Sequence, residues 1–171
     1  MPQHIELNPV SHLTIGAVGP PGERVFYIQG SRGTEIITLI MEKQQARMLA
    51  NGLESLLEEL QERFPGNQRE APDTVWTDLR LRQPLEPIFR IGNMGLGFNE
   101  ESSRIVVVAY ELVEEEEEPN VVSFWTSRSQ VKSLIPHIQE VVSAGRPICG
   151  NCGQPMDPGG HFCPRRNGHM S

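Results

Sequence analysis

Two stretches decide the expected fold: residues 36–57, IITLIMEKQQARMLANGLESLL, and residues 121–142, VVSFWTSRSQVKSLIPHIQEVV. In each, a short apolar run leads into apolar residues at three- and four-residue spacing, which is typical of a strand followed by an amphipathic helix. At an offset of 85 positions, all ten apolar residues of these segments in the second stretch meet apolar partners in the first. The match predicts an internal duplication. Two unrelated strand-helix units in phase would also match in part, and this alternative stays open.

Working outward, the same patterns predict two units with the order strand, strand, strand, helix. The predicted strands are at about 13–19, 24–30, 34–41, 87–97, 104–113 and 120–126, and the helices at about 43–64 and 128–143. Each unit, about 13–64 and 87–144, would leave one apolar face open. We therefore expect an α+β body over residues 1–144, in which the two units pack about a pseudo-twofold and bury each other.

Local signals refine this expectation. Ser127 followed by Gln130 predicts a capping box at the second helix, and Pro136 should kink or split that helix. A connector at 65–86 is punctuated by prolines but also carries several large apolar residues. These residues are unfavourable in water, which indicates a packed crossing rather than a free linker. They are Val75, Trp76, Leu79, Leu81 and Leu85.

Charge and hydropathy limit the functional classes. The chain has 171 residues and a net charge of −7, of which residues 143–171 carry +2 and the rest −9. An acidic body argues against general nucleic-acid binding, although Arg146, Arg165 and Arg166 in the tail could contact anions such as phosphates. The longest apolar run, Ile105–Tyr110, is far shorter than the roughly 18 residues of a membrane span, and no secretory signal opens the sequence. We expect a cytoplasmic protein.

The tail, residues 145–171, carries the most informative motif. All three cysteines lie there, as Cys149-x-x-Cys152 and Cys163, with His161 two residues before the last. Two thiolates on a tight turn can face one ion, and residues two apart in an extended segment share a face. The spacing predicts a small zinc knuckle with Cys149, Cys152, His161 and Cys163 as ligands.

Two alternatives to this ligand set stay open. A Cys-x-x-Cys pair can be redox-active, although such pairs usually open a helix after a strand, whereas this one lies among glycines and prolines. His169 could replace His161 as the fourth ligand. Four protein ligands leave no open position for water or substrate, so the predicted zinc is structural.

Several motifs together resemble domain-of-unknown-function family 3090, known mainly from actinobacteria and some other bacteria. They are Cys149-x-x-Cys152, Pro155-Met156-Asp157-Pro158-x-Gly160-His161-x-Cys163-x-Arg165-x-Asn167-Gly168, Phe26-Tyr27, Glu42-Lys43-Gln44-Gln45, Phe89-Arg90-x-Gly92-x-Met94-Gly95-Leu96-Gly97 and Ser143-Ala144-Gly145-Arg146-Pro147. The resemblance covers essentially the whole chain. It implies a zinc tail in a bacterial protein, favours His161 over His169, and implies no activity or substrate.

Signals for catalysis are weak. Gly16 with Gly19, and Gly92 with Gly95, could form phosphate-cradling loops, but neither pair clearly precedes a helix, and strand bends are the preferred interpretation. No nucleophile, base and orienting carboxylate form a known signature. The preferred function is therefore a non-catalytic binding or regulatory protein for a protein or small-molecule partner. The alternatives are an enzyme for a phosphorylated or nucleotide-like substrate, and nucleic-acid binding through the tail.

Overall fold

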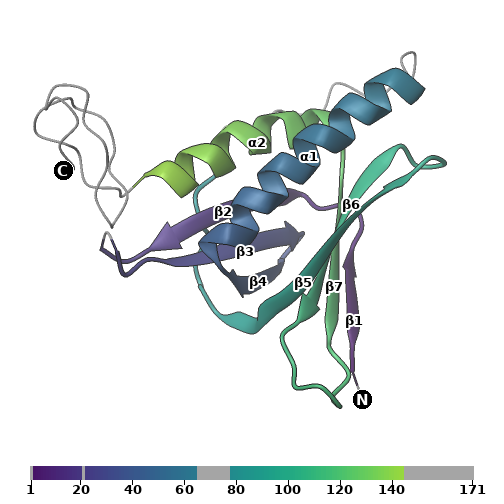
Figure 1. The fold of residues 1–171 in the computed structure, drawn as a ribbon. Coiled ribbons are helices and arrows are strands. Elements are labelled where there is room, and N and C mark those ends of the chain that lie inside the picture. The colour runs from purple at the N-terminus through teal and green to yellow at the C-terminus, as the bar shows by residue number, and fades with distance from the viewer. Residues whose placement is uncertain (1, 21, 65–77, 145–171) are drawn as a thin grey trace, which may run out of the picture.

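The chain forms one mixed seven-stranded sheet and two helices, as the computed structural model describes for residues 2–20, 22–64 and 78–144 (Figure 1). The strands are β1 (His4–Leu7), β2 (His12–Val18), β3 (Val25–Arg32), β4 (Glu35–Met41), β5 (Pro87–Asn99), β6 (Arg104–Glu111) and β7 (Val121–Thr126). The helices are α1 (Lys43–Arg63) and α2 (Arg128–Ser143). The strand order is β1-β7-β6-β5-β4-β3-β2. The predicted α+β class is therefore confirmed.

The units β2-β3-β4-α1 and β5-β6-β7-α2 follow one another along the chain, in the predicted element order. Strands within each unit are antiparallel neighbours, whereas β4 pairs parallel with β5. Here the third strand of one unit meets the first strand of the other, so the two units join edge to edge. The units thus share one continuous sheet, and the pseudo-twofold relation between them stays a prediction. Duplication itself stays a hypothesis.

Polar side chains fix where both helices begin. Gln45 Oε1 accepts a hydrogen bond from the Glu42 backbone N–H at 2.8 Å, at the start of α1. At the start of α2, Ser127 Oγ accepts from the Gln130 N–H at 3.2 Å and Gln130 Oε1 accepts from the Ser127 N–H at 3.0 Å, which confirms the predicted capping box. The helix continues past Pro136, so the proline does not split it.

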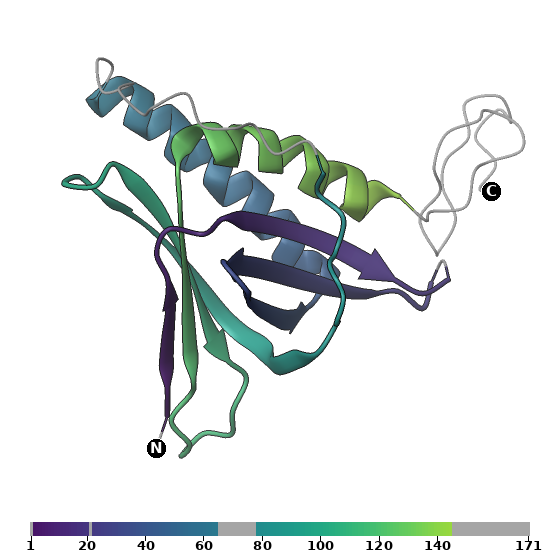
Figure 2. The ribbon, with the colours of Figure 1, turned by 180° about the vertical axis from the view of Figure 1, so that it is seen from behind.

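The two helices lie next to each other on one side of the sheet (Figures 1 and 2). Their apolar residues form the core with alternate residues of the strands. Leu53, Leu134 and Ile138 are fully buried. Each such side chain contributes roughly 1.5–3 kcal/mol by leaving water. No helix among the described residues is long and apolar enough to cross a membrane.

The sheet curves strongly, so that strands far apart in its order approach each other (Figure 2). A Cβ added to Gly30 on β3 would lie 2.5 Å from the Phe124 ring on β7. The absence of a side chain at Gly30 therefore lets the ring pack against β3. Residues 8–11 also link β7 and β3 through the backbone. Val10 N–H donates to Trp125 O of β7 at 2.9 Å, and Ser11 N–H donates to Ser31 O of β3 at 2.7 Å. The segment follows β1, a strand that the sequence analysis did not predict.

Candidate functional site

The sheet face turned away from the helices is its outer face, and in the first unit it is unusually polar. His12, Thr14, Gln29 and Thr38 are each at most 4% exposed and come from β2, β3 and β4. Strand pairing sets Thr14 beside Gln29 and Gln29 beside Thr38 on this face. Buried polar groups need hydrogen-bond partners, so something must cover and satisfy this row.

Residues 78–83, at the end of the predicted connector, cover the polar row. Gln29 accepts from the Arg82 backbone N–H at 2.7 Å and donates to the Arg82 carbonyl at 3.0 Å, as a neighbouring strand would. The Thr14 hydroxyl donates to the Leu79 carbonyl. Leu81 packs over Gly16, where an added Cβ would lie 2.6 Å from the leucine Cγ. The segment therefore lies on the sheet as an extended chain held by side chains; residues 65–77 of the connector lie outside the described residues.

Two histidines lie near the start of this segment, where Asp78 is its first residue. His12 Nε2 donates to the Asp78 carbonyl at 2.6 Å, and burial lowers the pKa of His12 below its ordinary value. The Asp78 carboxylate accepts hydrogen bonds from Arg80, which hold the pKa of Asp78 far below its usual range. His137 Nε2 donates to the Ile15 carbonyl at 2.8 Å. Asp78, Leu79, Arg80 and His137 line an open hollow of about 450 Å³, and these bonds serve to hold the connector and α2 on β2.

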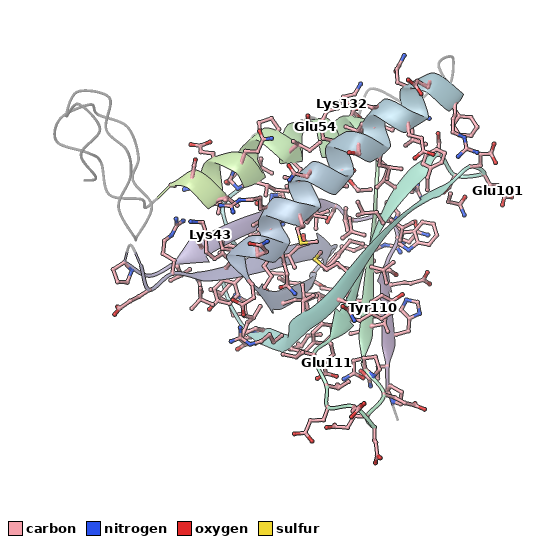
Figure 3. All side chains as sticks on the ribbon, viewed as in Figure 1. Lys43, Glu54, Glu101, Tyr110, Glu111 and Lys132 are labelled. Carbon is pink, nitrogen blue, oxygen red and sulfur yellow. The ribbon has the colours of Figure 1, made fainter. Side chains whose placement is uncertain are left out.

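The outer face of the second unit has a different character. We call it the aromatic face: Gly95, Gly97, Val106, Val108, Tyr110, Val121, Ser123 and Trp125 from β5, β6 and β7, with His4 and Glu6 of β1 beside them. Trp125 Nε1 donates to Ser123 Oγ at 3.3 Å, so the indole lies along its own strand. His4 Nε2 lies 3.3 Å from the same oxygen. Tyr110 is 39% exposed, near the end of β6 (Figure 3).

Acidic groups surround the lower end of the aromatic face. The loop from β6 to β7 contains Glu114–Glu118, all exposed, as expected for a solvated run. With Glu111 and its neighbours the loop lines an open hollow of about 620 Å³. Glu111 Oε1 accepts from the Asn120 backbone N–H at 3.1 Å and side chain at 3.0 Å, which fixes the return of the loop to β7. The face therefore combines an exposed tyrosine and a half-buried tryptophan with negative charge at its lower end.

The glycines considered for phosphate loops lie in or beside strands. Gly16 is in β2 and Gly19 follows that strand with φ +118°, whereas Gly92 and Gly95 are in β5. Gly92 lies close to the Leu112 backbone, since an added Cβ would be 3.0 Å from its Cα. Both helices begin after other strands, β4 and β7. Neither glycine pair is thus placed at a helix N-terminus, where a phosphate would be bound.

The predicted zinc ligands Cys149, Cys152, His161 and Cys163, the alternative His169, and the predicted anion contacts Arg146, Arg165 and Arg166 lie outside the described residues. Within residues 2–20, 22–64 and 78–144, no group of three or more His, Cys, Asp or Glu side chains could hold a metal ion. The residue from which the tail starts is well anchored. Arg24 Nη1 donates to the Val141 and Ala144 carbonyls at the end of α2, and its guanidinium lies 5.3 Å from the centre of the Phe26 ring.

A comparison with family models identifies the chain. The model of the family described as "Protein of unknown function (DUF3090)" matches residues 5–163. The chain belongs to this family. The match extends through α2 into the tail and includes all three cysteines. No curated protein and no solved structure matches the chain.

The sequence analysis missed the aromatic face, although a signal for it was present. A strand with one solvated face alternates apolar and polar residues. Residues 105–110, IVVVAY, do not alternate, so both sides of β6 are apolar. This run indicates a strand that is covered on both faces or that offers one of them to a partner.

Proposed function

We propose that this DUF3090 protein is a non-catalytic binding or regulatory protein of the bacterial cytoplasm, whose body contacts a partner through the aromatic face. One observation carries the proposal. The chain covers the outer face of the first unit with its own residues 78–83, whereas the aromatic face of the second unit leaves Tyr110 39% exposed. An exposed tyrosine on a sheet face that also carries Trp125 and several valines is typical of an interaction surface, where aromatic residues are enriched.

In this proposal the tail is a separate structural element, in which Cys149, Cys152, His161 and Cys163 bind one zinc ion. The thiolate-rich ligand set suits zinc, and four protein ligands close the site to substrate. The Arg24 contacts to the last turn of α2 support the proposal, because they give the tail a fixed starting point beside the β2–β3 hairpin. The zinc would then orient the tail without taking part in chemistry.

Native mass spectrometry of the full-length protein, purified from its bacterial host without chelator, tests the proposal. We expect one zinc ion per chain and a retained protein partner in wild type, and loss of the partner but not of the zinc in Trp125→Ala. The matched control is Met48→Ala, which removes a 63%-exposed apolar side chain from α1 and should keep both. A retained small molecule that the wild-type protein converts to a product would instead establish the enzyme alternative.

A further inference from the structure

The first unit shows what kind of chain its outer face accepts. Residues 78–83, Asp-Leu-Arg-Leu-Arg-Gln, alternate apolar and basic side chains. Leu81 fills the space above Gly16, and Gln29 holds the backbone of Arg82 by two hydrogen bonds, while Arg82 Nη1 donates to Ser31 Oγ at 3.3 Å. A glycine in the first strand of the unit thus provides the depression into which a leucine of a crossing segment fits.

The first strand of the second unit, β5, also carries glycines that leave a depression on its outer face. Gly95 and Gly97 lie on the aromatic face, beside Val108 and Val106 of β6. A Cβ added to either glycine would meet no described atom within 4 Å, and neither has a positive φ. Packing against the described residues therefore does not require glycine at positions 95 and 97, and neither does the backbone conformation. Glycine inside a strand often marks the close approach of another backbone or a ligand.

Charge decides which chain could approach. Glu6 lies on the aromatic face itself, and Glu111 and Glu114–Glu118 lie at its lower end. The cation on β6, Arg104, donates to Asn8 Oδ1 at 2.8 Å at the upper end. A second copy of this chain, with its net charge of −7, and a nucleic acid would both be repelled by this surface. A basic segment would be attracted to it.

We propose that the aromatic face binds an extended segment of a partner protein in which bulky apolar residues alternate with Arg or Lys. An apolar side chain of the segment occupies the space above Gly95 and Gly97 against Val106 and Val108, and its basic neighbours approach Glu6 and the acidic loop. The inference rests on the proposed binding function and names the chemistry of the partner. The packing of residues 78–83 on the first unit is the precedent for the proposed contact between this segment and the second unit.

Titration of the isotope-labelled, zinc-loaded full-length protein with a synthetic peptide tests the proposal by NMR. The probe is an acetylated, amidated peptide of alternating leucine and arginine. The controls are a peptide of alternating leucine and glutamate, and one with the same leucines and arginines in two blocks. We expect the alternating basic peptide alone to shift the amides of β5, β6 and β7 and the Trp125 indole N–H. Equal shifts with the block peptide, or shifts confined to Glu114–Glu118, would overturn the proposal.

Two variants locate the contact. Gly97→Val places apolar atoms in the opening, and its Cβ meets no described atom within 4 Å, so we expect it to keep the thermal midpoint of wild type and to weaken the probe by about tenfold or more. Glu6→Gln should weaken it severalfold, whereas Glu54→Gln, the same change on an exposed position of α1 (Figure 3), should not. Unchanged affinity in Gly97→Val contradicts the proposal.

The free protein provides a final check. A soluble paramagnetic reagent should broaden the Trp125 indole resonance of the full-length chain, because the proposal requires this face to be accessible. Protection of that resonance would show that the chain's own remaining residues cover the face, which overturns a partner there. The partner retained in native mass spectrometry is an independent measurement, so failure of the peptide would leave the broader binding function to be judged by that experiment.

Discussion

At the scale of single residues, Gln29 shows how much one buried amide can do. Its oxygen and nitrogen hold the N–H and C=O of Arg82, and the nitrogen also donates to Thr38 Oγ1 at 3.0 Å. A side chain here substitutes for a neighbouring strand. Since a buried backbone group left unpaired costs about 1–3 kcal/mol, the position should tolerate no apolar substitute.

We predict that Gln29→Leu lowers the free energy of unfolding by roughly 1–3 kcal/mol, because the buried Thr38 Oγ1 loses its donor and residues 78–83 lose their attachment to the sheet. Urea denaturation measures the change, with Gln44→Leu on the exposed side of α1 as the matched control. Equal stability of the two variants would show that the contact of residues 78–83 with the sheet contributes little.

The effect of a glycine-to-alanine substitution on stability should depend on the space available for the added methyl group. Gly30→Ala places a methyl group 2.5 Å from the Phe124 ring and should cost roughly 1–3 kcal/mol, the range for an overpacked core. Gly95→Ala meets nothing among the described atoms and should be neutral or stabilising by up to about 1 kcal/mol. Thermal denaturation of both variants tests the contrast, and a loss of stability in Gly95→Ala would contradict it.

His12 should make stability depend on pH. Its pKa is lowered in the folded state, chiefly by burial, whereas the unfolded chain takes up a proton near pH 6.5. Above that pH the ring is neutral in both states and adds no dependence. Below it the unfolded state binds more protons, so the free energy of unfolding should fall as the pH drops from about 7.5 to 5.5. Denaturation across this range should give a shallower decline in His12→Gln than in wild type or in the exposed-position control His4→Gln.

At the scale of elements, polar contacts fix the residue at which each helix begins, which sequence periodicity alone predicts only approximately. Gln45 reaches beyond its capping role, since Nε2 donates to the Ile91 and Gly92 carbonyls at 3.1 and 3.2 Å and so joins α1 to β5. Gln130 is confined to the start of α2, where Oε1 accepts from Thr126 Oγ1 at 2.7 Å. The two glutamines match at the 85-residue offset but differ in their contacts.

Ser127→Ala should destabilise the protein by about 1 kcal/mol, because the Gln130 N–H loses its cap. Hydrogen exchange should show the loss as faster exchange in the first turn of α2, with the last turn unchanged. The reverse pattern is expected for Arg24→Ala, which removes the donor to the Val141 and Ala144 carbonyls. The same exchange profile in both variants would exclude these local roles.

Periodicity in the sequence predicted six strands and both helices, because each has its own alternation or apolar stripe. It could not predict β1, whose four residues pair with β7 through His4 and Val121, more than a hundred positions apart. Nor could it predict the polar row of the first unit, since Gln29 and Thr14 read as solvated positions in a strand until residues 78–83 are placed over them. The parallel β4–β5 pair was likewise not encoded in any local pattern, so the edge at which the two units meet could not be predicted.

At the scale of the whole molecule, the tail and the body should unfold separately. Cys149→Ala removes a predicted zinc ligand, and the short tail has too little apolar surface to fold without metal. We expect proteolysis within 147–171 to accelerate while the exchange protection of Ile36–Leu57 persists. Loss of protection throughout that range would show that zinc stabilises the entire fold.

The parallel β4–β5 pair bears on how the edge of the sheet at β7 is protected. Because the last strand of one unit pairs with the first strand of the next, the last strand of the second unit, β7, would be left with an unpaired edge. The first strand of an imagined third unit would pair parallel with β7, as β5 does with β4, and β1 already takes that position. Strand β1 therefore protects the edge of β7 from pairing with another chain. A chain lacking residues 2–7 should gain concentration-dependent, end-to-end association, and light scattering that finds it strictly monomeric would show that the edge is blocked by other means.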